Sequence, residues 1–321
     1  MPTIEERLAQ ITPKVERAKK HISDVNVEIL NFLKTDPYRV STKRDPQTRK
    51  LIYYVSNIQS VPDPIALMAG DAIQNMMTAL DHLAYQLVCA STNDNPPNPN
   101  WIYFPIQDDA TKYEAKKLGK IQGARQTTID AIDTIKPYKG GNDLLWMLYR
   151  LNNVEKHRLL FTVGSMFQSV NIGAHMQALM QKVWDQPDSP FKGKTVPILD
   201  LFLKPADVLF PLKIGDELFI DAPDAEVNEK MQFRFGVALS EPQIVQAQSL
   251  MELLIQLTAL SRASFPPSSR SWFKIIFKFL PVEIITTNYL TLTFLACRAP
   301  ETIACERNCL ENRNSCSGVS A

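Results

Sequence analysis

Two long segments of the chain carry apolar residues at alternating spacings of three and four positions. The first apolar series is Leu8, Ile11, Val15, Ala18, Ile22, Val25, Ile29 and Phe32. The second apolar series is Ala66, Ala69, Ile73, Met76, Leu80, Leu83 and Leu87. This spacing is typical of amphipathic helices, and two seams of similar length bury each other most economically as an antiparallel pair. Thr12-Pro13 indicates that the first helix begins or kinks there, and Asp36-Pro37 ends it.

Between the two long helices the pattern changes to that of a β-hairpin. Tyr38–Lys43 and Lys50–Ser56 are strand candidates, joined by the turn residues Asp45-Pro46-Gln47-Thr48. Further along, an extended anchor is expected over 101–106, and shorter helices over 110–118, over 126–135 and around His157. Residues 1–160 are therefore predicted to form a helical bundle that carries a hairpin near 38–56.

From residue 161 onward, short strands replace the helical period. Residues 231–239 alternate strictly between apolar and polar side chains, which predicts a strand with one buried face. Further strand candidates are 196–203, 207–211 and 213–221. Ser240-Glu241-Pro242-Gln243 resembles a helix start, and this helix is expected to run to about Ser264. The predicted fold class is α+β: a long-helix bundle with a hairpin insertion, then a β-rich segment, 161–265, with a small, mostly antiparallel sheet and a closing helix on the bundle.

The tail, residues 266–321, differs from the rest in composition. It is apolar and contains Cys297, Cys305, Cys309 and Cys316 without the paired spacing of a structural zinc site. Its longest uncharged run, Ile284–Cys297, is short for a bilayer span, so we favour an atypical extension that docks loosely or not at all over a membrane anchor. Residues 1–265 contain one cysteine, and the charged N-terminus lacks the apolar core of a signal peptide, so a cytoplasmic location is expected.

The net charge of the chain bears on whether it binds nucleic acid or a membrane. The chain is 45% hydrophobic and 21% charged with a net charge of +1, so no overall field attracts nucleic acid or an anionic membrane. One local exception is a run of basic residues with Glu114 as its single acid: Lys112, Lys116, Lys117, Lys120 and Arg125. Such a run is either a solvated helix face or a phosphate-contacting patch.

Two histidines fall on polar stripes of otherwise apolar helices. The stripe on the first helix is Asp71, Asn75, Thr78 and His82. The stripe on the second helix is Arg150, Asn153 and His157. Both stripes follow from a rotation of 100° per residue, so their members either converge on a ligand or face water. His21 and His175 lie outside both stripes and are expected on the surface.

The stripes leave a structural alternative open, in which Asp71, Asn75 and His82 hydrogen-bond to Asn153 and His157 across a helix pair. Asp81-His82 with a third ligand could hold a metal, but no second carboxylate cluster or H-x3-H pattern supports this, so no metal and no cofactor are expected. The sequence has no P-loop, G-x-G-x-x-G or G-x-S-x-G motif, which argues against ATPase, dinucleotide-binding and serine-hydrolase classes.

Several of these motifs together resemble a family of uncharacterised bacterial proteins. The resemblance covers about residues 10–265, and its main motifs are Gly70-Asp71 with Asn75 and Leu80-Asp81-His82-Leu83-Ala84, then Asn152-Asn153 with Lys156-His157-Arg158. The first motif also resembles that of HEPN domains, helical proteins that include RNA-cleaving toxins and defence nucleases. Their motif is an arginine and a later histidine with four to six residues between them. This chain has Met77 where the relatives have arginine, whereas Arg150 and His157 keep the loose spacing.

The HEPN resemblance implies metal-independent cleavage of RNA in a bacterial stress or defence system. Arg150, His157 and His82 would be the catalytic residues, because histidine transfers protons near neutral pH and arginine pairs with phosphate. Asp71, Asn75, Asp81 and Asn153 would bind or orient the ligand, and a homodimer could complete the site. The alternative is a non-catalytic helical scaffold that binds another protein through its β-rich part.

Overall fold

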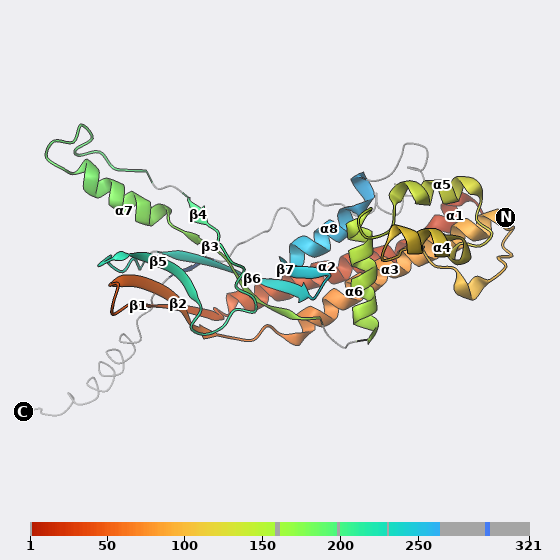
Figure 1. Ribbon diagram of the computed structural model, residues 1–321, viewed down its shortest axis with the longest axis horizontal. Helices are drawn as coiled ribbons and strands as arrows, with labels where there is room; N and C mark the ends of the chain where they lie inside the picture. Colours follow the sequence, from red (N-terminus) through yellow and green to blue (C-terminus); the bar gives the residue numbers. More distant parts are fainter. Residues whose placement is uncertain (1, 158–160, 198–199, 230, 264–292, 296–321) are drawn as a thin grey trace, which may run out of the picture.

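The computed structural model describes residues 2–157, 161–197, 200–229, 231–263 and 293–295. It confirms the α+β class: long helices form one part of the molecule, and two antiparallel sheets form the other (Figure 1). The first three helices are α1 (Ile4–Ala9), α2 (Thr12–Lys34) and α3 (Asp63–Ser91).

Helices α2 and α3 pack along their length and run in opposite directions, as predicted (Figure 1). The apolar series of both helices is buried, and Val25, Ile73 and Leu83 are fully inaccessible to solvent. Each such side chain contributes about 1.5–3 kcal/mol by leaving water. The pair is therefore the main source of stability in the helical part. The Thr12-Pro13 expectation also holds, because a new helix begins at Thr12 after α1.

The predicted hairpin is present as β1 (Tyr38–Arg44) and β2 (Lys50–Ile58). Strand β5 (Glu217–Pro223) pairs antiparallel with β2 and completes a three-stranded sheet in the order β1-β2-β5.

The second sheet has the order β4-β3-β6-β7 and lies beside the first. Its strands are β3 (Val163–Asn171), β4 (Phe202–Leu203), β6 (Gln232–Glu241) and β7 (Val245–Ser249), with β8 (Thr293–Leu295) also paired to β6. Tyr38 joins the two sheets: its ring stacks on Phe235 at 4.4 Å between centroids, and its hydroxyl donates to Ser165 Oγ at 2.9 Å. The sheets thus share one core.

Helices α4 (Ala110–Lys120), α5 (Gln126–Ile135) and α6 (Asp143–His157) match the sequence pattern closely. The structure adds a short 3-10 helix, η1 (Pro99–Trp101), and the closing helix α8 (Leu250–Ala263) begins later than expected. Helix α8 packs on α2, α3 and α6, so the chain after the sheets returns to the bundle as expected.

The predicted helix start at Ser240 is wrong. Glu241 is buried and belongs to β6, where its Oε1 accepts a hydrogen bond from the Thr162 N–H at 2.9 Å. The chain then turns into β7, with Glu241 paired to Val245, and the helix begins only at Leu250. Strand pairing therefore prevailed over a local capping pattern, which carries no information on distant partners.

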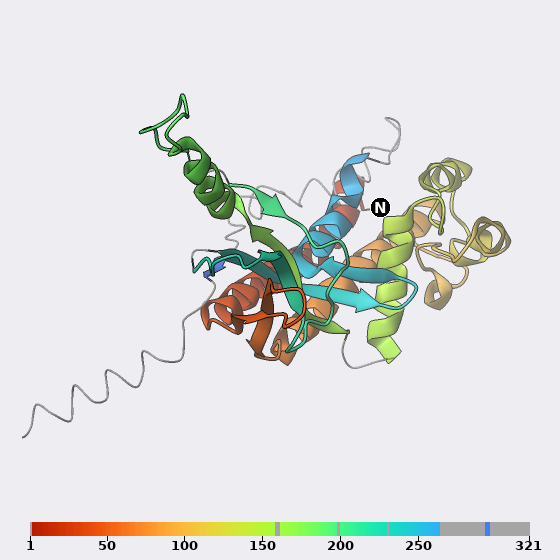
Figure 2. The same ribbon diagram turned by 60° about the vertical axis from the view of Figure 1, so that its left-hand side comes forward.

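Two further expectations for the β-rich segment are corrected. Residues 207–211 form no strand, and among the described residues of the expected strand 196–203 only Phe202–Leu203 lies in a strand. The structure also adds a helix that the pattern did not predict, α7 (Gly173–Trp184), which projects away from the sheets (Figure 2). Leu179, Met180 and Val183 are exposed, so apolar residues do not mark one buried face of this helix, and the hydrophobic pattern of the sequence did not indicate it.

Within the described part of the chain, no helix has the length and apolar character needed to cross a bilayer. The expectations for the tail, including the four cysteines from Cys297 to Cys316, lie outside the described residues apart from β8.

Candidate functional site

Asp81 on α3 occupies an unusual electrostatic position. Its side chain is half-buried, and Oδ1 accepts a hydrogen bond from the Phe104 N–H at 3.0 Å. Burial raises the pKa of Asp81 to about 6, and the Phe104 hydrogen bond and the nearby Lys156 and Lys120 only partly oppose this. The carboxyl group therefore changes charge close to physiological pH.

Lysines from two other helices surround this carboxyl group. Lys120 ends α4 and Lys156 lies in the last turn of α6. Burial lowers the pKa of Lys120, Asp81 raises it, and the like charge of Lys116 lowers it further. Lys116, Lys120 and Lys156 form no ion pair with any other described residue. The site thus has more cationic than anionic groups, an arrangement that favours an anionic ligand.

The end of η1 and the residues that follow it bring aromatic side chains close to Asp81 and the end of α4. The Tyr103 N–H donates to the Lys120 carbonyl at 3.1 Å, and this fixes the segment against the end of α4. Ile102 and Phe104 are buried, whereas Trp101 and Tyr103 are 72% and 45% exposed. We define the site face as Asp81, Trp101, Tyr103, Lys116, Lys120 and Lys156.

Arg150 is oriented by an acidic neighbour. Its Nη1 lies 3.5 Å from Asp108 Oδ1, which also accepts a hydrogen bond from Trp146 Nε1 at 3.3 Å. Its Nε is buried and has no hydrogen-bond partner among the described residues. One side of the guanidinium group is therefore engaged, and 39% of the side chain remains accessible.

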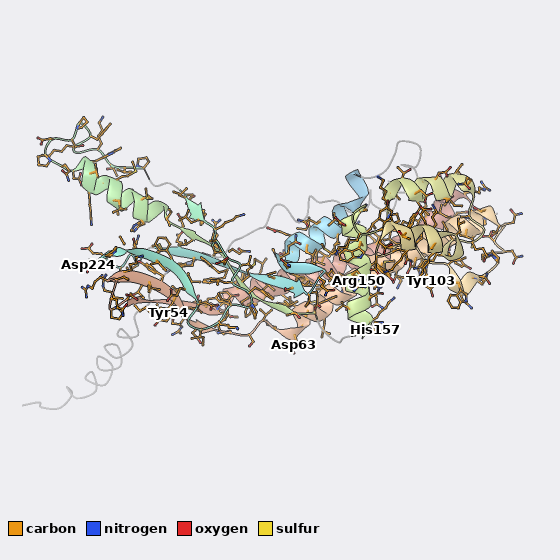
Figure 3. The ribbon with its side chains drawn as sticks, in the orientation of Figure 1. Tyr54, Asp63, Tyr103, Arg150, His157 and Asp224 are labelled. Carbon is orange, nitrogen blue, oxygen red and sulfur yellow. The ribbon has the colours of Figure 1, made fainter. Side chains whose placement is uncertain are left out.

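His157 lies at the opposite end of α6 from the Asp108 contact, and its side chain is exposed (Figure 3). His82 is also exposed, one position after Asp81. No hydrogen bond or ion pair in the described part of the chain joins Arg150, His157 and His82 to one another. The structure does not bring these three side chains into one contact cluster, although Asp81 and Lys156, their sequence neighbours, interact.

The predicted hydrogen-bond network across α3 and α6 is absent among the described residues. Asn75 Nδ2 donates instead to the Asp71 carbonyl in its own helix at 2.7 Å, and Asn153 is half-buried without a described hydrogen bond. The two helices approach closely at Gly70, where an added Cβ would lie 3.0 Å from Glu155 Cγ. Close packing therefore explains Gly70 better than ligand binding does.

The expectation that His21 and His175 lie on the surface is wrong. His21 is buried: its Nε2 accepts a hydrogen bond from Arg17 Nε at 3.0 Å, and its Nδ1 lies 4.0 Å from Asp71 Oδ2. The His175 side chain is 18% exposed and its Nε2 lies 3.5 Å from Asp221 Oδ1. Met77, which stands where the resemblance places arginine, is a buried core residue.

Sequence reasoning missed Trp101, Tyr103 and Lys156 as site residues. Residues 101–104 are an unbroken apolar run, Trp-Ile-Tyr-Phe, so no alternation in the sequence distinguished the exposed aromatics from the buried residues. The approach of Lys156 to Asp81 depends on the packing of α6 on α3, which no local signal reveals. No group of three His, Cys, Asp or Glu side chains in the described chain is arranged to hold a metal ion.

The fold and site face define an α+β protein with a half-buried carboxyl group among lysines and exposed aromatics. Searches against protein-family models, curated proteins and solved structures found no match to this chain. The resemblance to the bacterial family and to HEPN domains therefore stays a prediction.

Proposed function

We propose that this chain binds RNA through the site face, and that it acts on RNA in the manner of HEPN proteins. The observation that carries the proposal is the group of cations at Asp81: Lys120 and Lys156 interact with its carboxyl group, and Lys116 lies close enough to Lys120 to lower its pKa. Lys120 and Lys156 share this one carboxylate, so the cations still repel one another, and phosphate groups relieve that repulsion.

Cleavage is the finer part of the proposal. Arg150 can offer the accessible side of its guanidinium group to phosphate, while Asp108 fixes the other side. The exposed imidazoles of His157 and His82 are open to solvent and suited to proton transfer. Because they do not contact each other, a complete site requires RNA to bridge them or a second copy of the chain to supply one of them.

The test of binding is fluorescence anisotropy with a short labelled RNA over a series of salt concentrations. Replacing both Lys120 and Lys156 with glutamine should weaken binding and lower the slope of log K against log salt by about 1.4, since each single-strand phosphate contact contributes about 0.7. The control is the pair Lys34→Gln and Lys213→Gln, exposed lysines without a described ion pair. Equal losses in both double variants, or no RNA binding by the parent chain, would contradict the proposal.

The test of cleavage uses the parent chain with a mixed RNA pool in the presence of a chelator. Cutting that His157→Ala and Arg150→Ala both abolish, even at protein concentrations that saturate RNA binding, would support the HEPN-like activity. Binding without cutting would restrict the proposal to RNA binding.

A protein-binding scaffold is the second candidate, and α7 favours it. The far end of this helix projects from the sheets in both views and exposes Leu179, Met180 and Val183, whereas its first turn contacts β5 through His175 and Asp221 (Figures 1 and 2). Exposed apolar side chains on a projecting element are typical of protein-interaction surfaces. A stable complex lost on Val183→Asp, with RNA binding unchanged, would support this function.

A further inference from the structure

Trp101 and Tyr103 form a pair of neighbouring aromatic surfaces with a buried anchor between them. Ile102 between them has extended backbone angles (φ −86°, ψ 118°) and is 6% exposed, and Phe104 is 1% exposed. Residues two positions apart in extended chain lie about 6.5 Å apart. The buried residues hold the segment, so the exposed rings are presented outward.

Hydrogen bonds fix this aromatic pair before any ligand binds. The Trp101 N–H donates to the Asn98 carbonyl at 3.1 Å, and the Tyr103 N–H donates to the Lys120 carbonyl at the same distance. The Phe104 N–H donates to Asp81, which ties the segment to α3. A ligand that stacks on these rings therefore pays little conformational entropy to order them.

The Tyr103 backbone is bonded to the end of α4, the helix that carries Lys116 and Lys120, and this indicates the chemistry of the ligand. Exposed aromatic side chains offer flat apolar surfaces, and Lys120, to whose carbonyl Tyr103 is bonded, belongs to the cationic group of the site face. A ligand that matches both features has flat rings and a regular series of negative charges. Unpaired bases on a phosphate backbone have this form, whereas a duplex keeps the faces of its bases stacked inside.

We propose that Trp101 and Tyr103 are a stacking platform that makes the site face selective for single-stranded RNA, with two unpaired bases on the rings and the backbone along Lys116, Lys120 and Lys156. This inference rests on the proposed RNA binding and adds the class of RNA. The two residues, about 6.5 Å apart along the backbone, suit adjacent bases of an extended strand.

The experiment compares three probes with the full chain: single-stranded oligouridine, an RNA duplex of equal charge, and an abasic oligonucleotide that keeps the phosphates. Trp101→Ala and Tyr103→Ala should each weaken binding of the single strand by about tenfold, since stacking contributes about 1–3 kcal/mol per base. Binding of the duplex and of the abasic probe should not change. Tyr103→Phe keeps a ring and should keep the affinity.

The matched control is Trp184→Ala, which removes a tryptophan that stacks on Phe191 beside α7. Quenching of tryptophan fluorescence by oligouridine should persist in this variant and disappear in Trp101→Ala. Equal losses for single strand and duplex would show that Trp101 acts structurally and would overturn the platform.

Failure of the platform can be told apart from failure of the proposed function. If the lysine variant weakens RNA binding but Trp101→Ala and Tyr103→Ala do not, the platform is wrong and RNA binding stands. If the parent chain binds none of the three probes, both proposals are wrong. If a protein partner is lost on Trp101→Ala while the probes do not bind, the face belongs to a protein interface.

Discussion

At the scale of the residue, Asp81 links the stability of the fold to the charge of the site face. Its side chain holds the segment after η1 through the Phe104 hydrogen bond, yet burial disfavours the ionised form that makes the stronger acceptor. The same carboxyl group reduces the net positive charge that a phosphate backbone would meet. Its protonation therefore affects both folding and the attraction of anions.

Because of Asp81, the free energy of unfolding should fall as pH rises from about 4 to about 6. Burial raises its pKa from the ordinary value of 3.8 to about 6 in the folded chain, so the folded state binds the proton more tightly than the unfolded state. The stabilisation is complete below the unfolded pKa and is lost as pH rises through the folded pKa. Urea unfolding across this range should show a contribution on the order of 2–3 kcal/mol in the parent chain that Asp81→Asn lacks.

Asp130→Asn is the control for this prediction, because Asp130 is exposed on α5. It should keep the pH dependence of the parent chain. An Asp81→Asn variant with the same dependence as the parent would show that other groups cause it.

At the scale of the element, the local pattern predicted most helices and failed where pairing partners are distant. The α2 and α3 seams and the bounds of α5 follow from residues close in sequence, because a helix makes its own backbone hydrogen bonds. Glu241 shows the opposite case: its place in β6 depends on Thr162 and Val245, so a capping pattern misassigned it.

The candidate site follows the same division. His82, Arg150 and His157 were identified from their helical stripes, and Asp81 from its place beside His82 in the first motif. Lys156 reaches Asp81 only because α6 packs on α3. Tyr103 lies at the site only because its N–H donates to the Lys120 carbonyl. Single-helix periodicity gives the direction of a side chain but not the neighbour that it meets.

Helix α7 should be the first described helix to lose its protection against amide exchange. It projects from the sheets, and Leu179, Met180 and Val183 remain exposed, so little burial stabilises it. Hydrogen exchange followed by mass spectrometry should give protection factors for α7 at least tenfold below those of α3. Equal protection in both helices would show that a bound partner or another part of the chain covers α7.

At the scale of the whole molecule, the two halves of the chain are interleaved. Strand β5 completes the sheet that the hairpin begins, and α8 fills a space against α2, α3 and α6. Tyr38 further connects the sheets through Phe235 and Ser165. The helical part therefore uses core residues that arrive late in the sequence.

Residues 1–160 should not fold cooperatively on their own. Leu250, Leu253, Leu254 and Leu257 of α8 are at most 1% exposed, and together they contribute about 6–12 kcal/mol at 1.5–3 kcal/mol each, which is as large as the stability of a typical domain. Thermal unfolding followed by circular dichroism should show a broad transition for this fragment. Residues 1–265, which keep α8, should unfold sharply. A sharp transition in the shorter fragment would contradict the expectation.

The pairing of β2 with β5 has a consequence during synthesis on the ribosome. The hairpin is complete at Ile58, but its partner strand begins only at Glu217. At about 5–20 residues per second, the nascent chain keeps the edge of β2 open for about 8–30 s. That edge contains Leu51-Ile52-Tyr53-Tyr54-Val55, an apolar sequence of high β propensity that readily pairs with other chains. During this interval β2 can pair with a neighbouring nascent chain instead of β5, and this lowers the yield of native protein. Chaperones that cover strand edges, or a lower rate of chain initiation, should therefore raise that yield.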